Sequence, residues 1–524
     1  MSEKRDSLLK FLLSKGSSEM DGTARGAVCC KVKRDLFAQS AKVLKEAGVR
    51  LVAEWASDES FFDRGFALYA AYSAGEEYLL IKTELANDSP YFPSLTKYFP
   101  AAHRFERQIH SLMGLIPFDH PDLRPWIKHE HWPEDAYPLR KSFDGKKPMA
   151  KAQGEYRWVT AEGEGVFEIP VGPVHAGIIE PGHFRFQAVG EGIINLETRL
   201  GYAHKGIEKR FESLPWHEAV RLAGRVSGDS TVAHAVAFCM AAEEASGCVL
   251  PAKARYIRAI MMERERVANH LGDIGAICND TGFAFLHNQF SILREKVLRT
   301  NRVVFGHRLM MDRVTLGGVA TDIGAQDVAL FSDEIRTLKD EFDRLARIYD
   351  DNPTVQDRVY GTGVLEPEVA KYLGVVGFVA RASGQPLDVR IQGQFPPYDK
   401  HLPKANILTS GDVHARAWIR IEEVRDSFRL LKEMIGALPD GPLSAEWTRP
   451  LPEVSGFSAV EGWRGEVVYW VQCGLDRNIN RCMVRDPSSV NWLAIEQAIR
   501  GGNIVPDFPL CNKSFNQSYS GHDL

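Results

Sequence analysis

Three long segments of the chain repeat apolar residues at the spacing of one face of an α-helix. They cover residues 252–278, 325–350 and 410–438, and the last of them begins near Gly411. Apolar residues at intervals of three and four positions form a continuous stripe along a helix, and such a stripe has to be buried against other elements. Long helices joined by short connections pack as a bundle. We therefore expect a helical core in the second part of the chain.

The first of these helices also predicts which of its residues face the core. Its apolar face contains Ile257, Ile260, Met261, Val267, Leu271, Ile274 and Cys278. The charged run Glu263–Arg266 falls largely outside that face, and we expect it to lie outside the core.

The first part of the chain has a different pattern. Residues 34–49 have helical spacing, and residues 49–57, 66–74 and 77–85 have the pattern of β-strands separated by turns. A helix followed by an antiparallel sheet is typical of a small α+β domain. The polar segment 142–156, rich in Gly and Lys, is the best candidate for a linker.

Two further segments, residues 165–178 and 183–202, have a strand pattern and precede the helical part. The predicted fold class is therefore α+β. It consists of a small N-terminal α+β domain and a large, mainly helical domain that opens with a β-sheet. We place the two domains at residues 1–145 and 157–524, with the linker at residues 146–156.

Composition limits the class of function. With 64 basic and 69 acidic residues the net charge is −5, which does not indicate a nucleic-acid partner. No run of about 18 apolar residues predicts a membrane span. The N-terminal stretch has charges on both sides of a short apolar patch, which does not fit a signal peptide. The eight cysteines form no C-x-x-C pair, and we expect reduced thiols in a cytosolic protein.

Nucleotide and hydrolase fingerprints are absent from the sequence. It contains no P-loop, no G-x-G-x-x-G after a strand, no G-x-S-x-G and no H-E-x-x-H. We therefore expect no NAD site in this chain, so any link to NADH would lie in another subunit.

Two blocks of motifs resemble known proteins. Residues 106–143, with the motifs HPDLR and PLRK, resemble the 30-kDa peripheral-arm subunit of respiratory complex I. Residues 169–212 resemble the opening of the 49-kDa subunit, and even more closely the large subunit of group 4 [NiFe] hydrogenases of the formate hydrogenlyase type. The motifs MMERERVANHL and VARASGQPLDVR continue the match. The resemblance covers nearly the whole chain from about residue 90, and fused C/D-like polypeptides occur in both families.

The resemblance to hydrogenases directs attention to their metal ligands. In that family two C-x-x-C pairs hold nickel and iron, because soft metals in a redox site require thiolates. The corresponding positions in this chain are Ser227, Ser230, Ser518 and Gly521. We therefore expect no metal bound by this chain and no [NiFe] chemistry. Metal-carrying members are made with a tail that is removed after metal insertion, and the resemblance implies none here.

Complex I subunits also lack these cysteines, and there the same cleft resembles a quinone headgroup site. The histidine and tyrosine that hold the headgroup in that family correspond to Ile179 and Gly228 of this chain. Both polar anchors are therefore missing. The resemblance implies a hydrogenase-related subunit that lies between the two families.

Candidate site residues follow from the same motifs. Glu180 and His183 flank a Pro-Gly turn, and we interpret them as a proton relay that lines the cleft, with a surface turn as the alternative. His175 is a candidate for cofactor contact. His234 we interpret as a core histidine whose hydrogen bonds are satisfied.

Asp229 introduces an acid between two of the serines. One interpretation is a small polar pocket formed by Ser227, Asp229 and Ser230, which would hold water or a hydrated cation. The other is that Asp229 and Ser230 cap a helix that begins near Thr231. The two interpretations are compatible.

Charged residues in two further motifs complete the set of candidates. By resemblance, one loop lies near the membrane-arm interface and an iron–sulfur partner, with a solvated charge run as the alternative. Its candidates are His204, Lys205, Glu208 and Lys209. Arg381 and Arg390, with Asp388, match positions near the family cleft, and either a catalytic role or ion pairing for structure alone explains them.

These observations predict a peripheral-arm subunit of a membrane-bound, ion-translocating oxidoreductase complex. The expected partners are a small subunit that holds one [4Fe–4S] cluster and the ion-translocating subunits of a membrane arm, on the cytoplasmic side of the cell membrane. The cleft would pass electrons to a quinone or another small acceptor. Two alternatives stay open: a structural subunit that only couples its partners, and a hydrogenase with an atypical metal site.

Overall fold

The computed structural model describes residues 18–524, apart from residues 21, 76, 177–178 and 394. Residues 1–17, where we expect no signal peptide, and residues 177–178, at the end of a predicted strand, lie outside this described part. None of the helices in the described part combines the length and the apolar character that crossing a bilayer requires.

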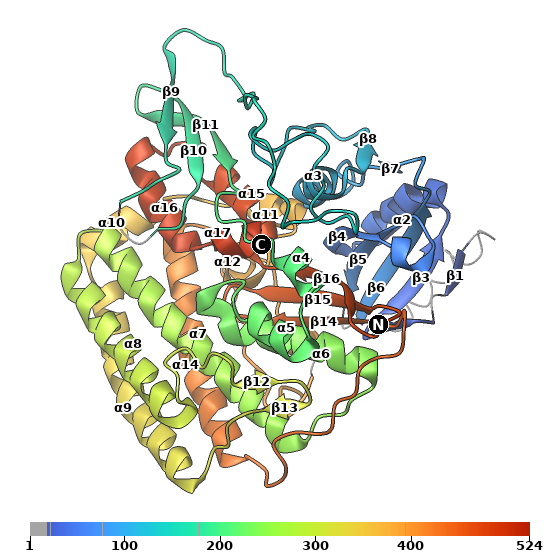
Figure 1. The fold of residues 1–524 in the computed structure, drawn as a ribbon. Helices are drawn as coiled ribbons and strands as arrows, with labels where there is room; N and C mark the ends of the chain where they lie inside the picture. Colours follow the sequence, from blue (N-terminus) through green and yellow to red (C-terminus); the bar gives the residue numbers. More distant parts are fainter. Residues whose placement is uncertain (1–17, 21, 76, 177–178, 394) are drawn as a thin grey trace.

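The N-terminal region is a five-stranded sheet covered by a helix, which confirms the predicted helix and three strands (Figure 1). The strand order is β1-β3-β6-β5-β4, and β3 and β6 are its one parallel pair among the described residues. The apolar side chains of the helix are buried on the sheet, as its spacing predicts. The elements are β1 (Ser18–Met20), β3 (Val28–Val32), α2 (Arg34–Glu46), β4 (Arg50–Asp58), β5 (Phe66–Ala74), β6 (Glu77–Leu85) and α3 (Ala102–Met113).

The second region opens with a three-stranded antiparallel sheet, as predicted. Its strands are β9 (Val166–Val171), β10 (His183–Val189) and β11 (Gly192–Arg199), with β10 in the middle. The first predicted strand ends at Val171, because Gly172 and Pro173 follow it. No helix or strand occurs between β8 and β9 in the described chain, which is where the predicted linker lies. The domain boundaries themselves stay a prediction.

Long helices form the bulk of the second region, so the predicted α+β class is confirmed (Figure 1). Helix α7 is central and packs against both α8 and α14. All three predicted long helices are present, with ends within three residues of the predicted ones. The long helices are α6 (Thr231–Ser246), α7 (Ala252–Asp280), α8 (Ala284–Phe305), α9 (Ala325–Asp350) and α14 (Val413–Gly436).

Shorter elements connect these layers and form the end of the chain. The short helices are α4 (Ile207–Phe211), α5 (Trp216–Ala223), α10 (Pro353–Val359), α11 (Pro367–Leu373), α12 (Gly377–Ala382), α13 (Val389–Gln392), α15 (Ser488–Ala498), α16 (Phe508–Phe515) and α17 (Tyr519–Asp523). The short strands are β2 (Ala24–Arg25), β7 (Tyr91–Pro93), β8 (Ile116–Phe118), β12 (Val314–Thr315) and β13 (Gly318–Val319).

The prediction that Glu263–Arg266 lies outside the core is wrong. All four side chains are buried in α7. The spacing correctly identifies the most apolar face, but α7 is enclosed on its other sides too, so its charged residues are buried with partners. Arg264, for example, donates to Glu334 at 2.7 Å. A buried charge persists in such a position when it is paired and hydrogen-bonded.

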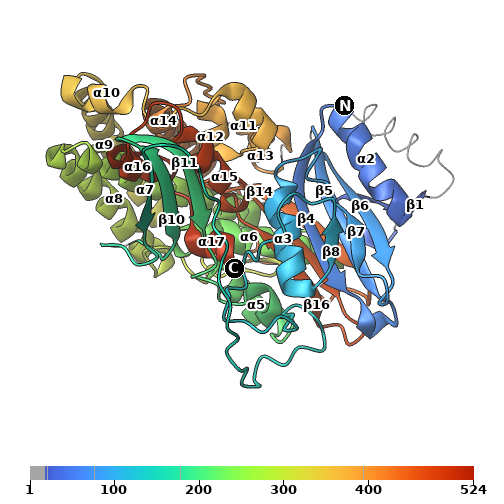
Figure 2. The same cartoon turned by 90° about the horizontal axis from the view of Figure 1, so that it is seen from above.

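A buried sheet near the C-terminus joins the two regions and was not predicted. It contains β14 (Ser455–Glu461), β15 (Glu466–Cys473) and β16 (Ile479–Arg485), and β2 from the N-terminal region adds to β14 in parallel. In Figure 2 this sheet runs beneath the N-terminal sheet. Trp470 of β15 contacts Trp55 and Tyr69 of the N-terminal sheet, with ring centroids 5.5 and 4.8 Å apart. Aromatic pairs at this spacing stabilise the junction beyond the apolar area that they bury.

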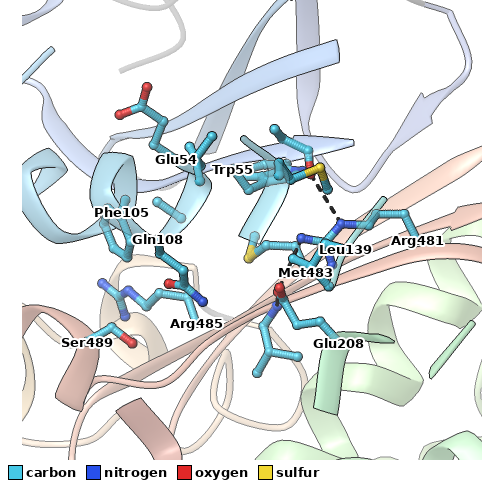
Figure 3. Close-up of a pocket in the computed structure, with 15 residues that line it drawn as sticks. Glu54, Trp55, Phe105, Gln108, Leu139, Glu208, Arg481, Met483, Arg485 and Ser489 are labelled. Atoms are coloured by element: carbon cyan, nitrogen blue, oxygen red, sulfur yellow. Dashed lines mark hydrogen bonds and ion pairs between the residues drawn. The ribbon is translucent and has the colours of Figure 1, made fainter. Parts of the chain in front are cut away.

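The seam between the two regions contains a small, partly open pocket (Figure 3). Strand β4 and helix α3 form one wall and β16 forms the other. Arg481 and Arg485 of β16 donate to the backbone carbonyls of Ala56 and Val52 on β4, at 3.2 and 3.1 Å. The seam is therefore held by hydrogen bonds to edge carbonyls of β4 as well as by apolar contact.

Gly456 of β14 provides a test of this packing. A Cβ atom at this position would lie 1.9 Å from the carbonyl oxygen of Ala241 in α6. We expect Gly456→Ala to lower the free energy of unfolding by about 1–3 kcal/mol, because the strand would have to move away from the helix. Gly436→Ala is the control, since no atom lies within 4 Å of the added Cβ. Urea unfolding followed by tryptophan fluorescence measures both, and equal midpoints for the two variants would contradict the expectation.

Candidate functional site

The four positions that replace the metal ligands meet at one point between η2 (Gly228–Ser230) and the start of α17. The Ser227 and Ser518 hydroxyl oxygens are 2.9 Å apart, within hydrogen-bond distance. The backbone N–H of Gly521 donates to Ser518 Oγ at 2.8 Å. Ser230 reaches the same cluster through Asp229, at 3.4 Å. The structure thus brings together residues that are almost 300 positions apart in the sequence.

An ion pair occupies the centre of this cluster. Arg464, from the turn between β14 and β15, donates to both carboxylate oxygens of Asp229 at 2.6 Å. The same guanidinium approaches the hydroxyl oxygens of Ser227 and Ser230 at 3.5 and 3.3 Å. Burial alone would raise the pKa of Asp229, but Arg464 and the Ser227 hydroxyl lower it below its ordinary value. Asp229 is therefore ionised at neutral pH.

An open cleft adjoins the ion pair. Its open space is about 1090 Å³, part of which is continuous with solvent. Glu180, Asp229, Asp280, Lys513 and Tyr519 all contribute to its lining. The cleft therefore presents acids, an ammonium group and hydroxyls beside apolar groups such as Ile179 and Pro509.

Glu180 lines the cleft and also fixes its C-terminal wall. Its carboxylate accepts hydrogen bonds from the backbone N–H groups of Tyr519 and Ser520, at 3.2 and 3.1 Å. Gly182, two residues later, leaves room for the Tyr519 ring, because a Cβ there would lie 2.5 Å from Cε1 of that ring. The EPGHFR motif is thus built around the first residues of α17.

The two histidines of this turn are placed away from the cleft lining. His183 Nδ1 lies 3.2 Å from the carbonyl oxygen of Gly172, and its ring packs on Trp158 with centroids 4.7 Å apart. His175 Nε2 lies 2.7 Å from the carbonyl oxygen of Gly182. The two histidines therefore connect residues near the end of β9 with residues at the start of β10. Of the predicted relay, the structure places Glu180 but not His183 at the cleft.

His234 is a satisfied core histidine, as predicted. Its side chain is fully buried, and its ring nitrogens lie 3.0 Å from Tyr469 Oη and 2.9 Å from Asp486 Oδ2. Asp486 in turn lies against Gly521. A Cβ atom built on Gly521 would lie 2.7 Å from the carboxylate of Asp486. A side chain at position 521 is therefore excluded by the buried His234–Asp486 pair.

The structure brings Ser227, Asp229 and Ser230 together, as the interpretation of a polar pocket expects, and Ser230 occupies the N-cap position of α6. Neither Asp229 nor Ser230 caps α6 with its side chain. Instead, Glu265 of α7 accepts from the first N–H groups of that helix, Val232 at 2.7 Å and Ala233 at 3.1 Å. Burial raises the pKa of Glu265 to about 8, although these N–H groups lower it. A cap from a distant helix cannot be read from the local sequence.

The residues expected near a partner surface make bonds within the chain. His204 Nδ1 lies 2.7 Å from the carbonyl oxygen of Asp523, and Lys205 donates to the carbonyl oxygens of Arg225 and Val226. Lys209 donates to Glu212 at 3.0 Å. Glu208 is buried in the seam, where it accepts from Arg481 at 3.0 Å (Figure 3). These side chains fix the last residues of the chain and the seam beside it.

Arg381 and Arg390 belong to a buried ion network in the core. Arg381 is paired with Glu423 and Glu461 at 2.7 and 2.9 Å. Arg390 is paired with Asp388 at 2.6 Å and Glu263 at 2.9 Å. Both guanidinium groups form ion pairs with carboxylates of this chain, and neither residue lines the cleft. The geometry matches the structural interpretation of this motif.

Several cleft residues were not identified from the sequence. Arg464 lies in a turn without a recognised motif, Asp280 lies at the end of α7, and Lys513 lies on α16 shortly before Ser518. Burial raises the pKa of Asp280, and the neighbouring Lys513 lowers it in part. Gln517 is buried, and its Oε1 atom has no hydrogen-bond partner among the described residues. These groups come together only in the folded chain, so the spacing of residues in the sequence does not predict that they share a cleft.

The donor groups of the cluster do not match a soft-metal site. Three hydroxyls and a backbone N–H stand where four thiolates would be needed, and an arginine lies among them. Within the described part of the chain, no three His, Cys, Asp or Glu side chains are grouped to hold a metal ion. Seven of the eight cysteines are buried, and Cys248 is partly exposed.

Comparison with known proteins gives the family. The family model of the respiratory-chain NADH dehydrogenase 49 Kd subunit matches residues 277–453, and that of the 30 Kd subunit matches residues 30–149. Formate hydrogenlyase subunit 5 of Escherichia coli K12 is 31% identical, over 89% of this chain and 83% of its own length. The fused C/D polypeptide of NADH-quinone oxidoreductase from Bacteroides thetaiotaomicron is 30% identical, over 82% of this chain and 85% of its own length.

A solved structure has the same fold over much of its length. A chain of the membrane-bound sulfane sulfur reductase, an archaeal respiratory membrane complex, is 24% identical with a TM-score of 0.64, and the match covers 69% of this chain and 99% of that one. The chain described here belongs to the family of fused 30-kDa/49-kDa (C/D) polypeptides of complex I, which is related to the large subunits of formate hydrogenlyase and hydrogenase-4. It is therefore a subunit of an oxidoreductase complex.

The ion network makes a prediction about stability. Arg390→Leu leaves Asp388 and Glu263 buried without this cation, so we expect the free energy of unfolding to fall by about 3–5 kcal/mol. Arg336→Leu removes an exposed pair with Asp333 and serves as the control, with a change within about 1 kcal/mol. Urea unfolding midpoints compare the two, and a small effect of Arg390→Leu would show that the network contributes little.

The cap of α6 makes a prediction about pH. The pKa of Glu265 is raised in the folded chain. Above pH 4.5, the ordinary pKa of a glutamic acid, the unfolded chain releases the proton of Glu265 while the folded chain keeps it. Stability contributed by the protonated form is present at low pH and lost as pH rises towards 8, by up to about 1.4 kcal/mol per pH unit. We expect Glu265→Gln to gain stability relative to the wild type between pH 5 and pH 8. Thermal unfolding at four pH values measures this, and the exposed Glu368→Gln should show no such trend.

Proposed function

We propose that this chain is a peripheral-arm subunit of a membrane-bound, ion-translocating oxidoreductase complex on the cytoplasmic face of the cell membrane. Electrons arrive from a [4Fe–4S] cluster of a partner small subunit, and the cleft passes them to a quinone or another small acceptor. The chain itself binds no cofactor firmly. Relatives named formate hydrogenlyase and NADH-quinone oxidoreductase support this reaction class.

The main support for this proposal is the open cleft beside Ser227 and Ser518, two of the positions that correspond to metal ligands in hydrogenases. The cleft lies next to the Arg464–Asp229 pair, and side chains of the described chain do not fill it. Clefts of this kind are where small organic molecules bind. Its mixed lining of charged, hydroxyl and apolar groups suits a headgroup that gains charge and protons on reduction.

We also propose that the cleft performs no [NiFe] chemistry. Hydroxyls are weak ligands for soft metals, and two of those present bond to each other. The Arg464 guanidinium stands among them and would repel a metal cation. The donor set does not fit the metals, so no step is assigned to them.

Proton supply is assigned to the acids of the cleft. Reduction of a quinone to a quinol consumes two electrons and two protons, and the electrons come from the partner's cluster. Asp280 is the better proton donor, because burial raises its pKa, and Glu180 is the acid nearest to solvent. Asp229 stays ionised beside Arg464 and holds the guanidinium in place. His183 lies outside the cleft lining, so it is not assigned to the relay.

A second candidate is a coupling subunit without chemistry of its own. The bonds that close the former ligand cluster favour it, since Ser227, Ser518 and Gly521 are tied to each other and leave no hydroxyl of this group fully free. In that case the cleft would transmit movement between partner subunits, and blocking it would leave electron transfer unchanged.

A cleft-blocking variant distinguishes the two candidates. Gly228 lines the cleft, and an added Cβ would meet only Met311 Cε, at 4.0 Å. We expect Gly228→Phe to fill the space and to slow electron transfer to a soluble quinone at least tenfold in the purified complex. Gly436→Phe adds the same side chain far from the cleft and should leave the rate unchanged.

The same preparation tests the absence of [NiFe] chemistry. We expect iron from the partner's cluster and no stoichiometric nickel, together with no hydrogen uptake. An unchanged rate in Gly228→Phe would favour the coupling subunit. Stoichiometric nickel with hydrogen uptake would instead establish a hydrogenase whose metal site uses other ligands.

A further inference from the structure

A second hollow lies away from the cleft, between the C-terminal half of α6 and the first turns of α7. Its open space is about 990 Å³, part of which is continuous with solvent. Val236 and Met240 of α6, Ala259 and Met262 of α7, and Phe395 form apolar walls. We call this hollow the α6–α7 pocket. It shares no lining residue with the cleft.

The charges at the polar end of the α6–α7 pocket are not balanced pairwise. Arg258 makes a two-point ion pair with Glu243, at 2.9 and 2.7 Å, and Glu243 also accepts from the N–H of Gly317. Arg255, one turn earlier in α7, lines the pocket, and the described part of the chain supplies no hydrogen-bond or ion-pair partner for its guanidinium. The pocket therefore combines apolar walls with a partly exposed arginine that has no ion-pair partner within the described part of the chain.

One further acid lines this pocket. Glu244 lines the same pocket without pairing with Arg255, and burial together with the neighbouring Glu243 raises its pKa. An anionic ligand at Arg255 would experience repulsion from Glu244. That repulsion is smallest for a head that carries a single negative charge, which disfavours a doubly charged phosphate.

We propose that the α6–α7 pocket binds a single-chain amphiphile with a carboxylate head. The carboxylate pairs with Arg255, whose planar guanidinium matches two carboxylate oxygens. The alkyl chain lies between Met240 and Met262, since methionine side chains adapt to flexible apolar ligands. Concave pockets that combine apolar walls with a small number of charged groups are typical small-molecule sites. This site is separate from the cleft and does not depend on the function proposed there.

The reactivity of Cys248 can report whether the α6–α7 pocket is occupied. It lines the pocket and is partly exposed, whereas the other seven cysteines of the chain are buried. A reagent such as N-ethylmaleimide should therefore modify Cys248 first in the folded protein, although burial raises the pKa of its thiol and slows the reaction. A ligand in the pocket would shield this thiol and no other.

The test compares decanoate with 1-decanol, which have the same chain length and different heads. The purified full-length chain is titrated with each by calorimetry below the concentration at which the probe aggregates. We expect Arg255→Leu to weaken decanoate binding about tenfold or more, through loss of a charge-assisted hydrogen bond, and to leave decanol binding unchanged. Arg336→Leu, an exposed arginine on α9, is the matched control.

Two further measurements locate the binding and control for folding. Decanoate should slow the modification of Cys248, measured by mass spectrometry, in the wild type and not in Arg255→Leu. Met240→Trp should weaken both probes, because the larger ring fills the apolar part, while the thermal midpoint of each variant reports that it is folded. The proposal is overturned if neither probe binds, if Arg255→Leu binds decanoate like the wild type, or if Cys248 is not protected.

Discussion

The ion pair between Arg464 and Asp229 holds together three segments that are far apart in the sequence. Arg464 also donates to the backbone carbonyl of Asn516, so one guanidinium connects η2, the β14–β15 turn and the C-terminal segment. The carbonyl of Asp229 in turn accepts from Trp463 and Asn269. The cleft can exist only where these segments stay in register, and a two-point charge-assisted pair supplies the directional contact that fixes it.

Much of the fold could be predicted because the strongest patterns are local. The spacing of apolar residues located α7, α9 and α14, and alternation located the strands of the N-terminal sheet. Strands β14–β16 were missed because all of their residues are buried, so no alternation marks them. The buried charges of α7 were misjudged for a related reason. Periodicity reports the most apolar face of a helix, and it does not report how many other faces are covered.

The site could be predicted only as far as its motifs reach. The replaced ligand positions were located through resemblance, and the polar pocket around Asp229 followed from its neighbours Ser227 and Ser230. Arg464 and Glu265 could not be predicted, because each acts across a tertiary contact with a loop more than 30 residues away. A sequence shows which side chains can donate or accept hydrogen bonds, but it does not show which partner each of them will have in the folded chain.

The parallel pairing of β2 with β14 has a consequence for how the chain can be divided. Strand β2 comes before the predicted linker, yet its hydrogen bonds are made to a strand more than 400 residues later. A cut within 146–156 would therefore produce two polypeptides that share a β-sheet, with the Trp470 aromatic cluster and the arginine contacts of β16 along the same boundary. Separately expressed halves would each expose an unpaired strand edge. Assembly of the two halves would have to re-form this strand pairing together with the aromatic and arginine contacts beside it.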